Sequence, residues 1–351
     1  MVTGVRESLG EEFRELTGPT HSCPICDARM AVVDGSLPGY VEGTSFAILD
    51  CTSCHLGQAY PTSADPSFYE MVYHNKWHVP GYSRYWYYRD FLLHHPKKGL
   101  EFLSSFEPCY WGVRRTLEEE GVRQDTRVLD VGSGLGYLTA VLRRGGLEAW
   151  GLEMSADAVR AAQAAFGPWY IQGSVEHGLS QLRGSFDLVL MIELIEHVDD
   201  PARLIEQAFS LVRPGGRLLV TTPNKSYFPS ETWRTDPPPN HLWWFSEQSI
   251  SRLADKLRLH CRFLDQTEYY RIHPGDRTPP QLEGPVLGSD GTCLKRESYL
   301  RRGLRATGSV QLARSLRDLT LRATARIARE GPGSHTAHRG PDMCAIFSEA
   351  K

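Results

Sequence analysis

From about residue 121 onward, the chain alternates short apolar runs with amphipathic helical stretches. A chain that repeats strand and helix in this way folds into a parallel sheet with crossover helices. We therefore expect an α/β fold with a doubly wound, mostly parallel sheet of seven strands. The expected strands are 126–134, 147–155, 169–176, 186–194, 216–224, 259–270 and 343–350. The expected helices between them are 137–146, 156–166, 200–216 and 245–258.

Three regions of different composition predict the domain organisation. Residues 1–62 contain two cysteine pairs separated by short β-like runs, and we expect a small N-terminal module there. Residues 63–120 are rich in aromatic residues and predict a helical linker or lid over the site, although packing against the core explains such residues equally well. Residues 121–351 form the α/β domain, which an arginine-rich helical insertion interrupts at about 271–340.

The overall composition excludes several classes of protein. The net charge of the 351 residues is −3, so the chain as a whole does not attract nucleic acid. No apolar run reaches the length of a membrane span. The N-terminus is polar and lacks the apolar core of a signal peptide. We expect a cytoplasmic protein whose cysteines are reduced thiols or metal ligands.

Four cysteines near the N-terminus have the spacing of a zinc site. Cys23 and Cys26 form one C-x-x-C pair, Cys51 and Cys54 form the other, and 24 residues separate the pairs. Each pair can present two thiolates to one tetrahedral ion, whereas a redox pair or two unrelated pairs would not need the other pair nearby. We expect structural Zn²⁺ in a closed four-thiolate site that stabilises the fold of the module and takes no part in chemistry.

A glycine-rich loop, DVGSGLG (130–136), follows the first expected strand and precedes a helix. Glycines allow a sharp turn and a close approach of the backbone to a ligand, and the helix N-terminus offers free N–H groups. A dinucleotide-binding loop would have glycine at its sixth position, where Tyr137 stands. Glu153 ends the second strand, where a carboxylate can accept hydrogen bonds from both hydroxyls of a ribose.

These motifs and their order resemble class I S-adenosylmethionine-dependent methyltransferases, over roughly residues 121–270 and the final strand. DVGSGLG is similar to their first motif, GLEMS to the acidic end of the second strand, and IQGSVE to the loop beside the adenine. Ser174 departs from the pattern, because many members have an acidic residue there. The cofactor-binding residues that the resemblance implies are Asp130, Gly132, Ser133, Gly134, Gly136, Glu153, Met154, Ser174 and Val175.

Two carboxylates and an imidazole follow the fourth expected strand. Glu193, Glu196 and His197 stand at i, i+3 and i+4, so that one helical turn would place them on the same face. Ligands of an open parallel sheet bind at the carboxyl ends of the strands, so we expect this group beside the transferred methyl. His241 follows the fifth strand, just before an aromatic run.

The combination of E-x-x-E-H with a later histidine resembles two groups of class I methyltransferases. These are the small-RNA 3′-terminal 2′-O-methyltransferases and, in looser form, the ubiquinone-biosynthesis O-methyltransferases. The resemblance to the first group implies a divalent ion, Mg²⁺, Mn²⁺ or Zn²⁺, which would lower the pKa of an acceptor hydroxyl. In the alternative, no metal binds and His197 or His241 acts as the general base. The metal ligands implied are Glu193, Glu196, His197 and His241, of which Glu196, His197 and His241 are also the expected catalytic residues.

The cysteine-paired opening, roughly residues 21–73, resembles bacterial sugar and natural-product methyltransferases, some of which methylate carbon. We therefore expect O-methylation of a hydroxyl on a small polar molecule. The alternatives are sugar C-methylation, RNA ribose 2′-O-methylation, and an inactive scaffold that keeps the fold. The insertion is expected to show a solvated basic helix face, or else to bind an anionic substrate, RNA or a membrane surface. Its arginines are Arg301, Arg302, Arg305, Arg314, Arg317, Arg322, Arg326 and Arg329.

Overall fold

The structure is a computed structural model that describes residues 21–63, 66–176, 182–227, 232–277, 282, 284–295, 303–305, 309–325 and 340–350. The polar N-terminus, residues 1–20, lies outside the described residues, as do four of the insertion's arginines, Arg301, Arg302, Arg326 and Arg329. No helix in the described part of the chain is long and apolar enough to cross a membrane.

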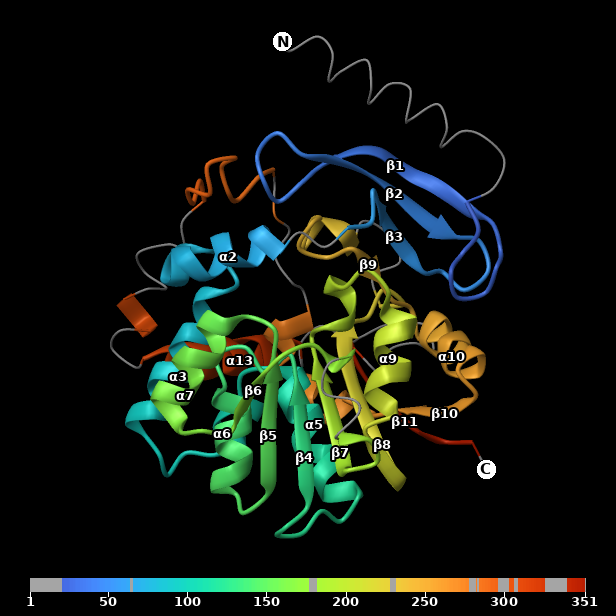
Figure 1. Cartoon of the computed structure of the whole chain (residues 1–351). Coiled ribbons are helices and arrows are strands. Elements are labelled where there is room, and N and C mark those ends of the chain that lie inside the picture. Colours follow the sequence, from blue (N-terminus) through green and yellow to red (C-terminus); the bar gives the residue numbers. More distant parts are fainter. Residues whose placement is uncertain are drawn as a thin grey trace.

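A seven-stranded sheet forms the centre of the molecule (Figure 1). β11 runs antiparallel to both of its neighbours, and the other neighbouring strands run parallel. The predicted fold class, a doubly wound and mostly parallel sheet, is therefore confirmed. The strand order is β10 (Leu259–Phe263), β11 (Asp342–Glu349), β8 (Val212–Pro223), β7 (Phe186–Ile192), β4 (Arg127–Val131), β5 (Glu148–Glu153) and β6 (Tyr170–Gln172).

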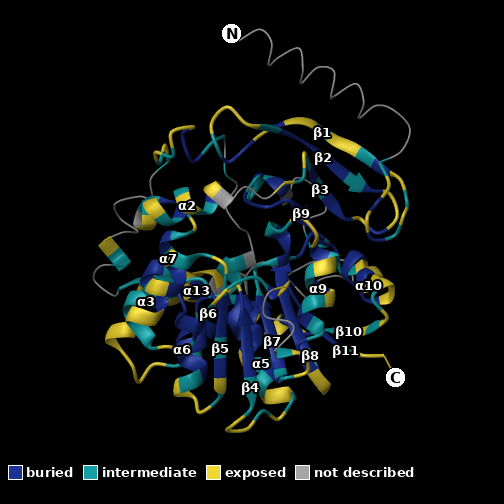
Figure 2. Ribbon diagram, viewed as in Figure 1, coloured by how far each residue is buried: buried dark blue, intermediate teal, exposed yellow. Residues whose placement is uncertain are grey.

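Alternate side chains of the central strands enter two different cores, one on each face of the sheet. Figure 2 shows that these strands are buried in the centre of the molecule. In β7, Val189 and Met191 pack with helices α9 (Pro201–Phe209) and α10 (Glu247–Lys256). Leu188 and Leu190 face the opposite core. Such alternation buries both faces, as a parallel sheet with helices on each side requires. The helices of the second core are α3 (Ser83–His94), α4 (Leu100–Ser104), α5 (Pro108–Glu119) and α6 (Tyr137–Arg144).

Local signals placed most helix starts correctly, and two of the expected elements differ from the structure. Ser155 caps helix α7 (Ala156–Phe166) by accepting a hydrogen bond from the Ala158 amide, as predicted. The helix expected over 200–216 ends at Phe209, because the Val212 end of β8 already pairs with β7 before a shift in register at the Pro-Gly-Gly segment. The strand expected over 259–270 ends at Phe263, and helix α11 (Thr267–Ile272) follows.

A second, four-stranded antiparallel sheet lies over the carboxyl ends of the parallel strands (Figure 1). Three of its strands come from the cysteine-containing region, namely β1 (Met30–Pro38), β2 (Ser45–Cys51) and β3 (Gly57–Tyr60). The fourth is β9 (Trp243–Trp244), which lies between β8 and α10 in the sequence. This sheet shares one hydrophobic core with α9 and α10. The expected domain boundaries, 1–62, 63–120 and 121–351, stay a prediction.

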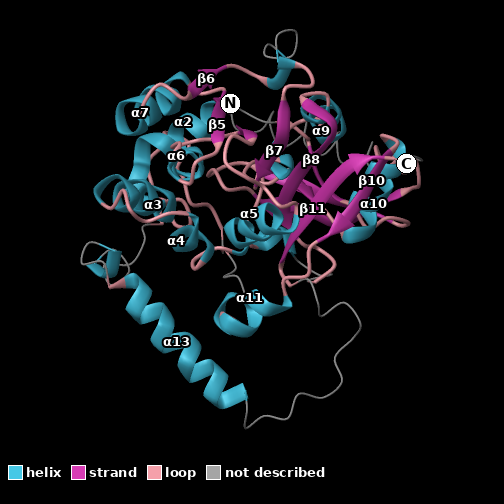
Figure 3. Ribbon diagram, turned by 90° about the horizontal axis from the view of Figure 1, so that it is seen from below, coloured by secondary structure: helices cyan, strands magenta, loops and turns pink. Residues whose placement is uncertain are grey.

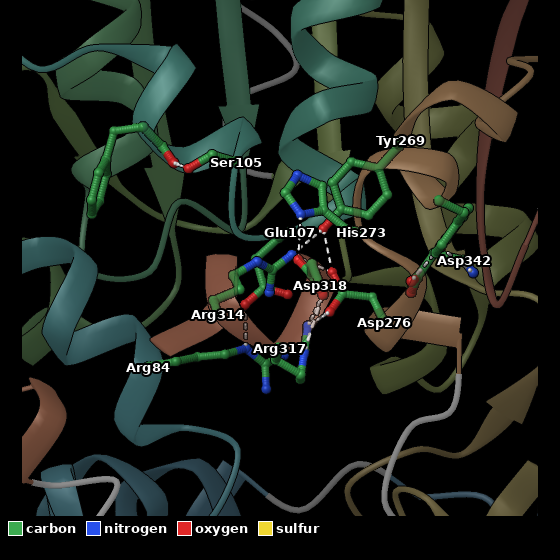
Figure 4. A network of polar contacts seen from close by, with 12 residues as sticks. Arg84, Ser105, Glu107, Tyr269, His273, Asp276, Arg314, Arg317, Asp318 and Asp342 are labelled. Atoms are coloured by element: carbon green, nitrogen blue, oxygen red, sulfur yellow. Dashed lines mark hydrogen bonds and ion pairs between the residues drawn. The ribbon is translucent and has the colours of Figure 1, made fainter. Parts of the chain in front are cut away.

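The described part of the arginine-rich insertion forms helix α13 (Val310–Ala325), which lies at the edge of the molecule (Figure 3). Arg314 and Arg317 pair with Asp276 of the turn η4 (Pro274–Arg277), and His273 Nδ1 lies 2.9 Å from an oxygen of the buried Asp318 (Figure 4). These two ion pairs attach the helix to the domain, and Arg314 is largely buried whereas the Arg317 side chain stays 45% exposed.

Gly136 permits the close packing of the glycine loop against its neighbours. Its φ is +78°, and a Cβ at this position would lie 2.6 Å from both Ala162 Cβ and the Tyr170 ring. We predict that Gly136→Ala lowers the free energy of unfolding by about 3 kcal/mol through overpacking and backbone strain. Urea denaturation of the purified protein measures the loss.

Gly43→Ala is the matched control. Gly43 has a φ of +82°, and a Cβ there would meet no atom within 4 Å. Its substitution should cost about 1 kcal/mol, the strain of the left-handed conformation alone. Equal losses in the two variants would contradict the packing role of Gly136.

Candidate active site

The four predicted zinc ligands converge at one point. The sulfur atoms of Cys23, Cys26, Cys51 and Cys54 all lie within 4.8 Å of one another. Cys23 Sγ is 3.6 Å from Cys54 Sγ, and Cys26 Sγ is 3.5 Å from Cys51 Sγ. Four convergent thiols, with no fifth ligand group in the cluster among the described residues, suit the closed tetrahedral coordination of structural zinc.

The backbone around the thiols forms two similar turns. Asp27 and His55, which directly follow the two pairs, both have a φ of 58°. The amides of Ser53 and Cys54 donate to Cys51 Sγ at 3.4 Å, although burial raises the pKa of this thiol overall. The hydrogen bond between Cys23 and Cys54 lowers the pKa of the Cys23 thiol to about 5 and raises that of Cys54. The chemistry of the donor set thus fits a cation, and the cluster could hold zinc.

We predict that the protein purifies with about one zinc ion per chain and that Cys54→Ser removes it, because three thiolates and a hydroxyl bind zinc more weakly than four thiolates. Elemental analysis after dialysis measures the stoichiometry. Cys261→Ser is the control, since Cys261 lies outside the cluster and should leave the zinc content unchanged.

The glycine loop follows β4 and opens α6, as predicted. Gly132, Gly134 and Gly136 all have positive φ, at 75°, 50° and 78°. These conformations bend the backbone sharply before the N-terminus of α6, where free N–H groups remain. The buried hydroxyl of Ser133 has no hydrogen-bond partner among the described residues. A loop of this shape can hold a polar ligand against its backbone.

Glu153 connects the two loops at the ends of β4 and β5. One carboxylate oxygen accepts from the Gly134 amide at 3.0 Å and the other from the Ser155 amide at 2.8 Å. Each oxygen keeps a second lone pair for a ligand hydroxyl. Beside it, Met154 leaves 71% of its surface exposed, although it is a large apolar side chain.

The other expected cofactor residues lie around the same loops. Val175 is buried and Ser174 is half-buried, both in the segment after β6. Sequence reasoning missed Tyr73 of helix α2 (Pro66–Asn75). Its hydroxyl would lie 3.5 Å from a Cβ at Gly134, so α2 covers the glycine loop.

Asp130 lies beneath the loop and does not face solvent. It is 2% exposed, and its carboxylate accepts from the Thr139 hydroxyl at 2.8 Å. Burial raises the pKa of Asp130 to about 7, although the Thr139 bond opposes the shift. The residue therefore fixes the loop to α6, and its expected role in cofactor binding stays a prediction.

This burial makes the stability depend on pH in a defined direction. Between about pH 4 and pH 7, Asp130 holds its proton in the native state and loses it in the unfolded state. The stabilisation that Asp130 contributes to the native state is thus complete below pH 4 and is lost as the pH rises through 7. We predict that a shift from pH 5 to pH 8 lowers the unfolding free energy of the wild type more than that of Asp130→Asn. Parallel responses in urea denaturation would contradict this assignment.

The carboxylate–histidine group lies at the end of β7, close to the glycine loop. The Glu196, His197 and His241 ligand atoms lie within 4.8 Å of one another. His197 Nε2 is 3.7 Å from a Glu196 oxygen, and the two imidazole rings meet edge to face at 4.7 Å. Glu196 and His197 belong to the turn η2 (Ile195–His197), and His241 stands two residues before β9.

Glu193 does not join this group. Its φ is 50°, and its amide donates to Thr221, so the chain turns left-handed before η2 begins. The single helical turn expected over residues 193–197 is therefore absent, and three of the four predicted ligands come together. Burial and the nearby Glu196 raise the pKa of Glu193 well above its usual range.

Glu196 and His241 are buried, and His197 is half-buried beside them. Glu196 is fully buried, and neither of its oxygens has a hydrogen-bond partner among the described residues. Burial raises the pKa of Glu196 to about 8, and it lowers the pKa of His197 and of His241 to about 3. Unpartnered buried carboxylates are costly, so a cation bound between these groups would stabilise the site.

Backbone contacts fix the orientation of His197, which the sequence did not reveal. The carbonyl oxygen of Asn240 lies 2.5 Å from His197 Nδ1 and can only accept, so Nδ1 carries the proton. The lone pair of Nε2 therefore faces Glu196. The Asn240 side chain in turn accepts from Tyr82 and donates to Asp236.

The aromatic segment divides between the core and the site. Trp86, Tyr87 and Tyr88 of α3 are buried in the second core, as the packing interpretation requires. Tyr69 of α2 meets the His197 ring edge on at 5.9 Å, and its buried hydroxyl has no hydrogen-bond partner among the described residues. Tyr69 and Tyr73 thus lie over the site and the loop, where a lid was expected.

The sequence of this chain matches a protein family and several curated proteins. Residues 103–259 match the family described as methyltransferase domain. The ubiquinone biosynthesis O-methyltransferase of Erwinia tasmaniensis is 33% identical over 112 residues, 30% of this chain and 45% of the relative. The enzyme of the same name from Albidiferax ferrireducens is 40% identical over 106 residues, 28% of this chain and 42% of the relative.

The chain spans about half the length of the curated relatives it matches. Among solved structures, a SAM-dependent methyltransferase from Archaeoglobus fulgidus is 13% identical, with a TM-score of 0.40 over 69% of this chain and 95% of its own. The family match covers β4 to α10 and includes both the glycine loop and the carboxylate–histidine group. Residues 103–259 therefore belong to an S-adenosylmethionine-dependent methyltransferase domain, and its seven-stranded sheet, which β10 and β11 complete, is typical of class I.

Proposed function

We propose that this protein transfers a methyl group from S-adenosylmethionine to a hydroxyl of a small polar molecule, a sugar or natural product, with the help of a divalent metal. The observation that carries the metal proposal is Glu196, whose two buried oxygens have no hydrogen-bond partner among the described residues. Two neutral imidazoles, those of His197 and His241, lie beside it. This donor set suits Mn²⁺, Zn²⁺ or Mg²⁺.

The loops after β4 and β5 would hold the cofactor, which supplies the methyl group. Amides of the glycine loop and the N-terminus of α6 would bind its polar end, and Glu153 would accept from its ribose hydroxyls. The exposed Met154 offers an apolar surface for the adenine, with Ser174 and Val175 on the neighbouring loop. The orphaned Ser133 hydroxyl fits a polar ligand in this position.

Glu196, His197 and His241 would hold the divalent ion, whose charge favours the ionised form of an acceptor hydroxyl. The low pKa values of the two histidines weaken the alternative in which no metal binds and a histidine acts as the general base. A general base works best with a pKa near the operating pH, whereas burial lowers the pKa of His197 and His241 to about 3. Neutral imidazoles with free lone pairs are better metal ligands than bases at this depth. Without a metal, Glu196 would be the group best matched to accept a proton, since its pKa is about 8.

Two observations support a small acceptor over RNA. The relatives that match residues of this domain are named as enzymes of ubiquinone biosynthesis, which is small-molecule chemistry. Arg314 and Arg317, which a basic RNA-binding face would present to solvent, pair with Asp276. Arg314 is largely buried in this pair, so the RNA alternative loses one of the exposed cations on which it rested.

We predict that Glu196→Gln weakens Mn²⁺ binding by more than about tenfold, because it removes the only carboxylate of the cluster, and that it abolishes methyl transfer. Electron paramagnetic resonance titration measures the metal affinity, and calorimetry should show S-adenosylmethionine binding within about twofold of the wild type. Full activity after removal of every divalent ion except the cysteine-bound zinc would contradict the metal proposal. Failure of the wild type to bind S-adenosylmethionine would refute the enzymatic proposal altogether.

Glu193→Gln is the matched comparison. If Glu193 is a fourth ligand, this variant also loses Mn²⁺ affinity by about tenfold. A change of less than about threefold limits the ligand set to the three clustered residues, as their geometry favours.

A further inference from the structure

The backbone segment that carries His241 is hydrogen-bonded on both sides. The amide of Leu242 donates to the carbonyl oxygen of Glu196 at 2.8 Å. The carbonyl oxygen of Leu242 accepts a hydrogen bond from the amide of Ala59, in β3, at 2.8 Å. One peptide segment thus joins the turn that contains Glu196 to a strand of the cysteine-containing sheet.

The same segment is the fourth strand of that sheet. Gly57 pairs with Trp244 and Gln58 pairs with Trp243, so β9 continues the sheet beyond β3. A Cβ at Gly57 would lie 3.1 Å from Trp244 Cβ, which shows how closely the two strands approach. The Trp243 indole also donates to the Val198 carbonyl at 2.7 Å, just after His197. The sheet therefore holds both sides of the carboxylate–histidine group.

The second cysteine turn is attached to the residues that flank this segment. Lys225, 3% exposed, donates from Nζ to both oxygens of Asp50 at 2.7 and 2.8 Å and to the His55 carbonyl at 2.9 Å. Its amide donates to the carbonyl of Phe245 at 2.8 Å. The Ser246 hydroxyl donates to the Cys54 carbonyl at 2.5 Å. Lys225 lies one residue beyond Asn224, which follows the last residue of β8.

We call the segment that contains the four cysteines and strands β1, β2 and β3 the cysteine module. From this arrangement we propose that the cysteine module positions the carboxylate–histidine group, and that Lys225 is the positioning residue that fixes the module to this group. The inference rests on the proposed function, because it concerns the same three ligands. Asp50 and His55 lie on either side of the second cysteine pair, so Lys225 holds the turn between them, which leads directly into β3. β3 in turn pairs with β9 and so orients His241. Lys225 touches none of the ligands and acts through the backbone.

The glycine loop gives the proposal a built-in contrast. It is made by the ends of β4 and β5 and fixed by Glu153 and Asp130, whose side chains hydrogen-bond to Gly134, Ser155 and Thr139 and, within the described part of the chain, to no residue of the cysteine module. Loss of the Lys225 contacts should therefore disturb metal binding and leave cofactor binding intact. Substitution of a residue that only stabilised the fold would not weaken metal binding while leaving cofactor binding intact.

The test is Lys225→Met in the full-length, zinc-loaded protein. We expect Mn²⁺ affinity to fall about tenfold, as for other residues that orient metal ligands indirectly. S-adenosylmethionine affinity should stay within about twofold, zinc content should stay at one per chain, and amide hydrogen exchange over residues 240–244 should accelerate.

Lys256→Met is the matched control. Lys256 also joins the domain to the module, since its Nζ donates to the Pro24 carbonyl at 2.6 Å, but this exposed contact lies at the first cysteine turn and does not reach β3 or β9. It should change neither the Mn²⁺ affinity nor the exchange of residues 240–244. If Lys225→Met does not fold, Asp50→Asn weakens the same link from the more exposed side and takes its place.

Equal Mn²⁺ affinity and equal exchange in the Lys225 and Lys256 variants would overturn the positioning role, whatever their thermal stability. If the wild type itself binds no Mn²⁺, the metal part of the proposed function fails, and the exchange comparison alone decides whether the module positions His241. The two failures are thus distinguishable.

Discussion

The parallel pairing of β4 with β7 determines where chemistry can take place in this protein. Asp130 is in register with Leu190 and Val131 with Met191, so the two strands end together. The glycine loop and the turn that contains Glu196 are therefore neighbours, although some sixty residues separate them in the sequence. Because parallel strands deliver their loops to one edge, both halves of the candidate site depend on this ladder.

Sequence reasoning succeeded where a local pattern has one structural solution. The glycines before Tyr137, the cap at Ser155 and the paired cysteines each impose a conformation on a few residues, and all were placed correctly. It failed at 193–197, where the i, i+3, i+4 spacing suggested a helical turn. There the Glu193 amide bonds to Thr221 of the neighbouring strand, and tertiary pairing overrides the local pattern.

The contacts that sequence could not supply are those between distant backbone groups. Asn240 holds His197 through its carbonyl, Leu242 bonds to Glu196 and Ala59, and β9 joins a sheet made by residues nearly two hundred positions earlier. Any residue type except proline can make such bonds, so no side-chain pattern announces them. The ion pairs of Arg314 and Arg317 with Asp276 likewise join residues that are far apart in the sequence.

The burial of Glu196 explains why such backbone support is needed. A carboxylate without hydrogen-bond partners, placed between two neutral imidazoles, favours protonation or a bound cation, and only accurate placement of the three groups favours the cation. Two of the ligands lie on one turn and the third on another segment, so their separation depends on what joins those segments. In this fold the join is the Leu242 peptide, and the cysteine module holds its outer side. By this route, a closed thiolate site would determine the geometry of the proposed metal site without performing chemistry itself.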